Sequence, residues 1–182
     1  MIKWIILAVA AILMIVICAT FIKCYNYLIT LKNRVENQAS QIEVQLRRRA
    51  DLIPNLVEIT REYASYEKET LQQVIGLRNH VLESGSLDAS YQADQKLGQA
   101  VHRLFAIGEQ YPELKANTNF LKLQDEMSDT EDKISKARQF YSDTVTKYNT
   151  AIMTFPQSLV AGCFHFHKID LKIIAANLLL YF

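Results

Sequence analysis

The order of apolar and polar residues separates an uncharged N-terminal run from a series of striped segments. Residues 4–22, WIILAVAAILMIVICATFI, carry no charged side chain. At about 1.5 Å per residue a helix of this length reaches about 28 Å, close to the ~30 Å hydrocarbon thickness of a bilayer. The run therefore predicts a transmembrane helix, with residues 1–23 as a membrane anchor that contacts the lipid bilayer through residues 4–22.

Two kinds of cleaved leader also begin with an apolar run. A signal peptide has an apolar region of only about 7 to 15 residues, followed by a small-residue cleavage site, and no good site precedes Lys23. A lipoprotein cut before Cys18 would need a small residue just upstream, whereas Val16 and Ile17 are bulky. The prediction is a retained, single-pass anchor.

The basic residues around the run predict which side of the membrane holds the rest of the chain. Lys3 lies before the run, while Lys23, Lys32 and Arg34 follow it. All three lie within the window that the positive-inside rule counts. This excess favours a cytoplasmic body.

Four further segments carry apolar residues at steps of three and four, as in helices with one apolar face. Their stripes, some of which include a polar residue, are in order Leu28, Leu31, Val35, Ala39, Ile42 and Leu46; Leu56, Thr60, Tyr63, Glu67, Thr70, Val74, Leu77 and Val81; Leu97, Val101, Leu104 and Phe105; and Met127, Thr130, Ile134, Ala137, Tyr141, Val145, Tyr148 and Ile152. Ser86 or Asp88 would cap the third helix, and the pairs 111–112 and 155–156, each ending in proline, would stop the third and fourth. Because short connections make successive helices antiparallel neighbours, we expect an all-α fold: an N-terminal transmembrane helix followed by an antiparallel up-and-down four-helix bundle.

Residues 47–57, RRRADLIPNLV, interrupt this pattern with three arginines and a proline. Proline costs about 3 kcal/mol inside a helix but is tolerated in the first turn. With Asp51 as N-cap, Pro54 would fall in that turn, and the arginines would end the preceding helix. The stretch predicts a corner between the first two body helices, and the absence of glycine leaves a kinked continuous helix as the alternative.

Nucleic acid and lipid headgroups are poor candidates for the partner of these arginines. The chain has 20 Lys and Arg against 19 Asp and Glu, a net charge of +1, whereas nucleic-acid binding depends on neutralising phosphates. A helix from Lys23 to Arg47 spans about 36 Å, well beyond the ~8 Å screening length at physiological salt.

Acidic side chains remain as partners for the arginines. Pairing within the chain, with Glu126, Asp129 or Glu131, is the preferred interpretation, and docking of a protein partner is the other. The candidate docking residues are Arg47, Arg48, Arg49, Asp51 and Asn55.

The sequence carries no motif that points to catalysis, a cofactor or a metal. None of the four histidines follows a glutamate by three positions, as a di-iron bundle would need, and nucleotide-binding and nucleophile motifs are missing. His165 with His167, or the acidic residues 125–132, could in principle hold a cation, but a lone HxH in an apolar tail is more often incidental, and an acidic face near a helix start usually meets solvent. The three cysteines form no CxxC pair. Tyr63, Tyr141 and Tyr148 occupy stripe positions and are expected in the core.

Several longer stretches resemble the LemA family of bacterial membrane-anchored proteins. They are Tyr25-Asn26, the motif NRVENQASQIEVQLRRRADLIPNLV at 33–57, the motif from YPELKANTNF to KYNT at 111–150, and FPQSLVAG at 155–162. The resemblance implies a single N-terminal span in the bacterial inner membrane and a four-helix bundle over residues 24–166. It also implies no catalytic residues and a largely undefined role in the cell envelope, with some relatives on magnetosome membranes.

The chain departs from the family pattern at a few positions. Ala50 stands where a larger side chain is expected, and Ser158 and His165 replace the usual Asn and Gly. Residues 167–182 form an atypical, mostly apolar tail in place of a charged one, and its final run is too short to span a bilayer.

Two functions are compatible with these features. The preferred one is a non-catalytic membrane-anchored scaffold or adaptor with protein partners, and no nucleic acid among its ligands. The alternative is an envelope sensor or ligand-binding protein with an unrecognised site built from residues 51–55 and 111–115, where Asn55, Glu113 and Lys115 lie beside predicted turns.

Overall fold

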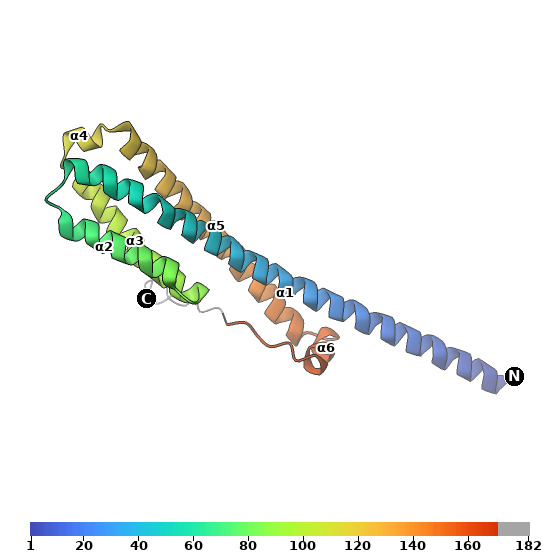
Figure 1. The fold of residues 1–182 in the computed structure, drawn as a ribbon. Coiled ribbons are helices and arrows are strands. Elements are labelled where there is room, and N and C mark those ends of the chain that lie inside the picture. Colours follow the sequence, from blue (N-terminus) through green and yellow to red (C-terminus); the bar gives the residue numbers. More distant parts are fainter. Residues whose placement is uncertain (171–182) are drawn as a thin grey trace, which may run out of the picture. The chain divides into compact units, whose positions relative to one another are not determined.

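A computed structural model describes residues 1–170 of the 182-residue chain, and all regular structure in them is helical (Figure 1). The helices are α1 (Ile2–Tyr63), α2 (Lys68–Glu83), α3 (Leu87–Gly108), α4 (Pro112–Lys115), α5 (Thr118–Met153) and α6 (Gln157–Cys163). The predicted all-α class and long N-terminal apolar helix are confirmed. Of the atypical tail, residues 171–182 lie outside the described part.

The chain forms two compact units, which are described separately. The N-terminal unit comprises residues 1–37 and 141–170, and the central unit comprises residues 38–140. Helices α1 and α5 each contribute to both units.

The corner predicted at residues 47–57 is wrong, because α1 continues through Pro54 to Tyr63. Proline has no N–H with which to bond the carbonyl four residues earlier, here that of Ala50. Arg78 of α2 donates its Nε–H to this carbonyl oxygen at 3.4 Å. A side chain from a neighbouring helix thus replaces the missing donor, and the helix persists.

The chain reverses instead at residues 64–67, between α1 and α2. The Ala64 N–H donates to the Thr60 carbonyl at 2.8 Å, and the Glu67 N–H donates to the Ala64 carbonyl at 3.1 Å. Ala64 itself is fully buried. The second predicted stripe therefore belongs to two helices, with Leu56 and Tyr63 on α1 and Val74, Leu77 and Val81 on α2.

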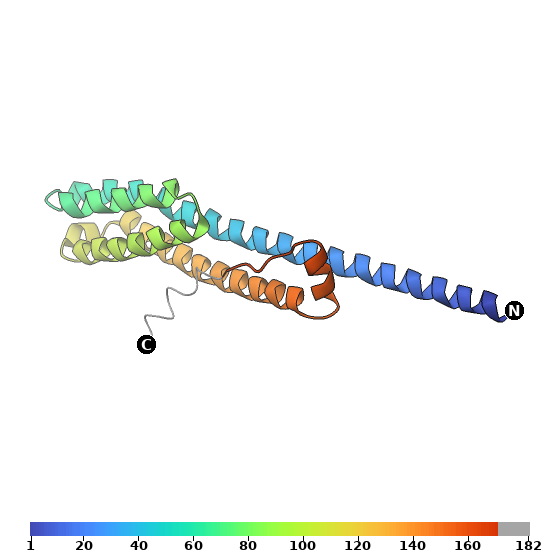
Figure 2. The same ribbon diagram turned by 90° about the horizontal axis from the view of Figure 1, so that it is seen from below.

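Helices α2 and α3 form an antiparallel pair in the central unit (Figure 2). The predicted cap at Ser86 is confirmed, because its Oγ accepts a hydrogen bond from the Ala89 N–H at 3.3 Å. Helix α3 ends at Gly108, slightly before the predicted stop, and Pro112 opens the short helix α4. A Cβ at position 108 would lie 2.6 Å from Phe120 Cζ, so this close approach requires glycine.

Asn117 caps the start of α5 and also holds the end of α1. Its Oδ1 accepts hydrogen bonds from the backbone N–H groups of Asn119 and Phe120, at 2.9 and 3.2 Å. Its Nδ2 donates to the Tyr63 hydroxyl at 3.2 Å. One amide side chain therefore joins two helix ends.

The core of the central unit is built largely from the predicted stripes. Side chains from α1, α2, α3, α4 and α5 contribute to it. Its large, fully buried side chains are Ile42, Leu46, Ile53 and Leu56 from α1, Val74 from α2, Leu97, Val101 and Leu104 from α3, Leu114 from α4 and Met127 from α5, of which Ile53 and Leu114 lie outside the predicted stripes.

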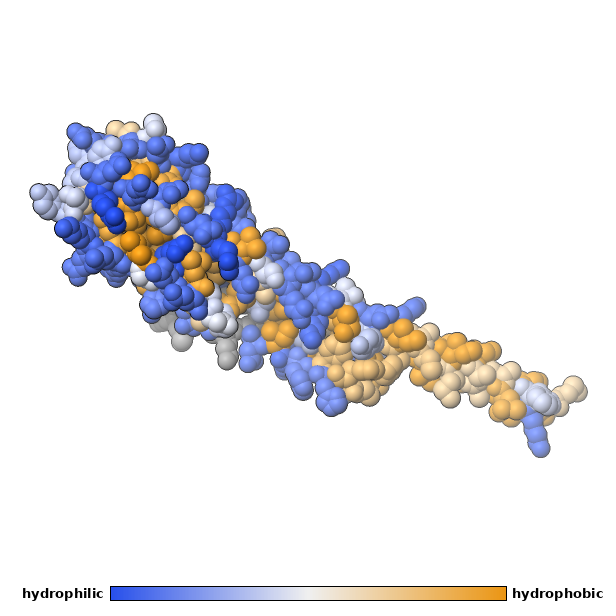
Figure 3. Space-filling view, in the orientation of Figure 1, coloured by the Kyte–Doolittle hydropathy of each residue, from blue (hydrophilic) through white to orange (hydrophobic). Residues whose placement is uncertain are grey.

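The N-terminal unit combines an exposed apolar helix with a packed base. Residues 1–23 are exposed, and α1 is long and apolar enough there to cross a membrane (Figure 3). Below this segment, Leu28 and Leu31 of α1 are buried, as are Val145 and Tyr148 of α5. The core positions predicted for Tyr141 and Tyr148 are confirmed, whereas Tyr63 is only half-buried.

The start of the tail is tied to α5 by polar contacts. The Tyr148 hydroxyl donates to the His167 carbonyl at 3.1 Å. Asn149 binds the backbone of Ile169 in both directions, donating at 2.9 Å and accepting at 3.0 Å. The backbone of residues 167–169 is therefore hydrogen-bonded to side chains of α5.

Candidate functional site

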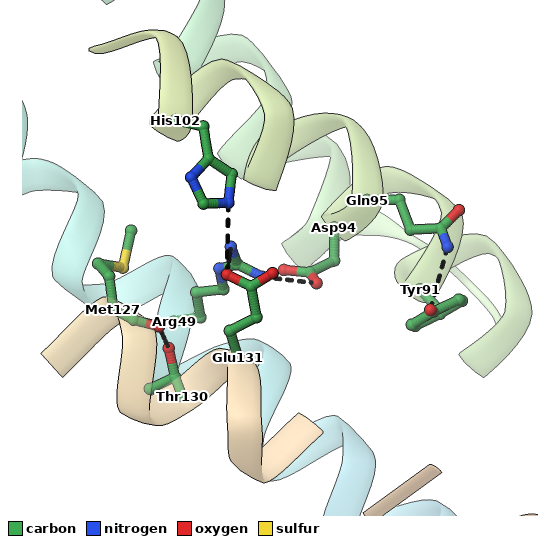
Figure 4. A network of polar contacts seen from close by, with 8 residues as sticks. All are labelled: Arg49, Tyr91, Asp94, Gln95, His102, Met127, Thr130 and Glu131. Carbon is green, nitrogen blue, oxygen red and sulfur yellow. Dashed lines mark hydrogen bonds and ion pairs between the residues drawn. The ribbon is translucent and has the colours of Figure 1, made fainter. Parts of the chain in front are cut away.

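Four charged or titratable side chains meet in the central unit (Figure 4). Arg49 comes from α1, Asp94 and His102 from α3, and Glu131 from α5. Arg49 Nη1 donates to Asp94 Oδ2 at 3.2 Å, and its Nη2 lies 3.6 Å from Glu131 Oε2. The same carboxylate oxygen lies 3.5 Å from His102 Nε2. We call these four residues the charge cluster.

Helical spacing brings two of these charges into the core. Arg49 follows Ile42 and Leu46 at helical steps on the buried face of α1, and only 4% of its surface is exposed. Asp94 lies between buried Tyr91 and Leu97 on α3 and is 2% exposed. Both charges therefore occupy positions that the helical repeat reserves for apolar side chains.

The environment of Asp94 makes its ionised form costly. Burial raises the pKa of the Asp94 carboxyl to about 6, although the neighbouring Arg49 charge acts to lower it, and Glu131 adds to the increase. Asp94 Oδ1 and Arg49 Nε are buried without a hydrogen-bond partner among the described residues. The pair is held by one short contact and leaves part of each group unsatisfied.

Small and aromatic residues of α3 shape the surroundings of the cluster. A Cβ at Gly98 would lie 3.0 Å from Arg49 Nη2, so glycine leaves the space that the guanidinium occupies. Arg138 stacks over the Tyr91 ring at 4.2 Å from its centroid, a cation–π contact. A groove of about 350 Å³ opens beside these side chains.

The chemistry available to the cluster is attraction between opposite charges. Glu131 and His102 lie at its outer edge, where about half or more of each side chain is exposed. Within residues 1–170 no three His, Cys, Asp or Glu side chains gather in a way that could hold a metal ion. The cluster thus links α1, α3 and α5 through charge.

The predicted pairing of the arginines with α5 is confirmed for two carboxylates. Glu131 pairs with Arg49, as described above, and Arg48 Nη2 lies 3.9 Å from Asp129 Oδ2 on the surface. Glu126 pairs instead with Lys122, at 3.9 Å along the same helix. The carboxylate closest to Arg49, that of Asp94, was not predicted.

The candidate docking residues divide into an exposed and a buried group. Arg47, Arg48, Asp51 and Asn55 are exposed, whereas Arg49 is buried and cannot present its guanidinium to a partner. Its inclusion among docking residues does not fit the structure. The reason is that Arg49 faces the core from the buried side of α1, while Arg47 and Arg48 face outward.

Three of the exposed residues line one groove of about 560 Å³, which we call the arginine groove. Arg47, Arg48 and Asp51 of α1 form one side, together with Val44, whose surface is 56% exposed. The other side comes from the end of α2 and the start of α3, with residues 81–90. The groove therefore combines an exposed apolar side chain with two cations and with the carboxylates of Glu43 and Asp51.

The alternative function predicts a ligand site built from residues 51–55 and 111–115. Asn55 lines a different groove, of about 330 Å³, whose polar walls include Glu58, Lys122 and Glu126. Glu113 and Lys115 are exposed and do not line that groove. The structure does not bring the two halves together in one cavity.

The sequence of this chain is similar to LemA proteins and to magnetosome proteins of bacteria. The model of the LemA family matches residues 38–177, and so extends into the tail. The chain is 25% identical to the magnetosome protein MamQ of Magnetospirillum gryphiswaldense, over 90% of this chain and 70% of that protein. It is 25% identical to magnetosome protein MamQ 2 of Paramagnetospirillum magneticum, over 79% and 62%, and 29% identical to protein LemA of Metamycoplasma hominis, over 82% and 67%. It thus spans between 62% and 70% of the length of these relatives.

Proposed function

The chain belongs to the LemA family, and on this premise we propose that it is a non-catalytic, membrane-anchored helical scaffold or adaptor of the bacterial cell envelope. The observation that carries the proposal is the make-up of α1. Its exposed residues 2–22 are uncharged apart from Lys3, and its later turns supply buried core residues and the surface arginines. A single helix thus provides both an anchor and a wall of the body.

The anchor is proposed to cross the inner membrane once, with the body in the cytoplasm. Its apolar length suits a bilayer, and the large exposed side chains there would be costly in water. Lys23, Lys32 and Arg34 supply the basic excess that favours this orientation.

The body is proposed to be a four-helix bundle with a partner site on its surface. Buried side chains from α1, α2, α3 and α5 support this proposal, as do the ion pairs that link α1, α3 and α5 in the charge cluster. A rigid surface of this kind suits docking, because little conformational entropy is lost when a partner binds.

The arginine groove is the proposed docking site. Arg47 and Arg48 would pair with acidic side chains of a partner, Glu43 and Asp51 in the same groove would exclude such side chains from their own positions, and exposed Val44 offers an apolar contact. Interfaces commonly combine an apolar centre with charged groups at the edge that steer association. A partner peptide with alternating acidic and apolar residues would match both features.

Site-specific photo-crosslinking in intact cells tests this proposal. A photoreactive amino acid at Val44 is expected to capture a discrete partner, and the R47A/R48A double substitution is expected to remove that adduct. The same probe at Tyr66, which is 93% exposed in the loop after α1, serves as the matched control. Identical background labelling from both positions, unaffected by the arginine substitutions, would contradict a docking role.

A further inference from the structure

The turn between α5 and α6 presents an uncharged apolar surface. Residues 151–164, AIMTFPQSLVAGCF, contain no charged side chain. Four large apolar residues of this segment are half or more exposed: Met153, Phe155, Leu159 and Phe164. Large apolar side chains rarely gather on an exposed surface of a protein. Where they do, they mark a surface that contacts another protein or a membrane.

Aromatic contacts fix the position of this turn along α1. The Phe164 ring lies 4.7 Å from the Tyr25 ring and 6.0 Å from the Phe21 ring, measured between centroids. The Phe166 ring contacts Tyr25 as well, at 6.1 Å. Phe21 belongs to the last turn of the apolar run, so Phe164 lies at the level where that run ends.

The residues around this level have the composition of a membrane–water interface. Tyr25 and Tyr27 follow the apolar run, and Lys23 precedes them. Immediately after the turn the chain carries His165 and Lys168. Tyrosine rings and basic side chains are enriched where a bilayer meets water, since their polar ends reach the headgroups.

We propose that residues 151–164 form a second membrane contact, in which Phe155 and Leu159 enter the headgroup and upper acyl region of the same leaflet boundary that α1 crosses. The inference rests on the proposed anchor and deepens it. The anchor would hold the chain in the bilayer, and the turn would hold the base of the N-terminal unit flat against the lipid surface. Interfacial segments of this kind bury their apolar side chains only about 5 to 10 Å deep.

Continuity with the apolar helix favours lipid over a second protein as the covering surface. The apolar surface of the N-terminal part of α1 continues onto the region where α5 ends (Figure 3). The Phe21–Phe164 contact joins the two surfaces directly. A bilayer that covers Phe21 must therefore come within reach of the turn.

Tryptophan fluorescence of the full-length protein in phosphatidylcholine vesicles provides the test. Trp4 is the only tryptophan in the chain, so the W4F variant has no tryptophan emission. In that background F155W or L159W supplies the sole tryptophan. Lipids brominated on the upper acyl chain quench tryptophan at shallow depth, and aqueous iodide quenches tryptophan in water. Y66W in the same background serves as the matched exposed aromatic control.

The expected result is that F155W and L159W lose most of their emission in brominated vesicles and resist iodide, while Y66W does the reverse. Iodide quenching of F155W and L159W with no effect of brominated lipid would overturn the inference, and quenching of native Trp4 by lipid in parallel would leave the anchor intact. Protection from both quenchers that disappears on dilution would assign the surface to a second copy of the chain and also overturn it. Absence of lipid quenching at Trp4 would refute the anchor and the inference together.

Discussion

Arg78 Nε lies 3.4 Å from the carbonyl oxygen of Ala50, which is the backbone acceptor that Pro54 leaves without its helical donor. The contact explains how α1 passes through a proline in its interior. It also gives a long side chain of α2 a specific role in the integrity of α1, which the sequence pattern of either helix alone does not indicate.

Replacing Arg78 by methionine should destabilise the central unit by about 1 kcal/mol, because the partly buried Ala50 carbonyl loses its donor. In a P54A background the alanine N–H satisfies that carbonyl, so R78M should cost less there. Urea unfolding of the full-length protein in detergent, followed by circular dichroism, measures both. R61M is the control, since exposed Arg61 lines the same surface without this bond; equal costs of R78M in the two backgrounds would disprove the role of the proline.

The charge cluster should be far more sensitive to removal of one partner than to removal of both. R49M leaves the buried Asp94 carboxylate without its cation and should cost about 3 to 5 kcal/mol at neutral pH. The double variant R49M/D94L should recover much of this loss, because no uncompensated charge remains. Unfolding free energies of the two variants decide the matter, and R48M, which breaks only the exposed pair with Asp129, should have little effect.

Stability should depend on pH through Asp94 in a specific direction. Its pKa in the folded protein is raised from 3.8 to about 6, so the folded chain binds this proton more tightly than the unfolded chain. The contribution of Asp94 is therefore most favourable below pH 4 and declines as the pH rises to about 6, by on the order of 2 kcal/mol. The difference in unfolding free energy between the native protein and D94N should fall across this window, and a difference that rose with pH would show that pairing with Arg49 outweighs burial.

Two glycines inside helices should respond oppositely to alanine. At Gly76 nothing lies within 4 Å of the added Cβ, so G76A should stabilise α2 by up to about 1 kcal/mol. At Gly98 the added Cβ would press on Arg49 Nη2. The guanidinium cannot move away easily, because its Nη1 is bound to Asp94. G98A should therefore lower the melting temperature although alanine favours a helix, and equal stabilisation by both substitutions would mean that the guanidinium moves freely.

Much of the fold follows from the apolar spacing, because stripes such as Ile42–Leu46 and Leu97–Val101 can be buried only against one another. The prediction that Pro54 begins a new helix is wrong for a physical reason. The cost of proline inside a helix depends on whether another group donates a hydrogen bond to the carbonyl four residues earlier, and the donor here, Arg78, is distant in sequence. The turn at residues 64–67 contains neither glycine nor proline, so the local sequence does not indicate that the helix ends there.

The charge cluster was predicted only in part. Acidic partners for the arginines could be expected on α5, since Asp129 and Glu131 face outward beside them. Asp94 has a weaker signal, a carboxylate at a core step of the α3 stripe between Tyr91 and Leu97. A carboxylate at a buried position requires a cation nearby, and Arg49 is the cation on the buried face of α1 that meets this requirement.

The two-sided bonding of Asn117 constrains how this chain can drift during evolution. Aspartate there would still cap α5 but would force the Tyr63 hydroxyl to turn from acceptor to donor, and serine would cap without reaching Tyr63. Substitutions at positions 63 and 117 should therefore be correlated among homologues. In distant homologues, a phenylalanine at 63 is expected beside a residue at 117 that serves the helix cap alone.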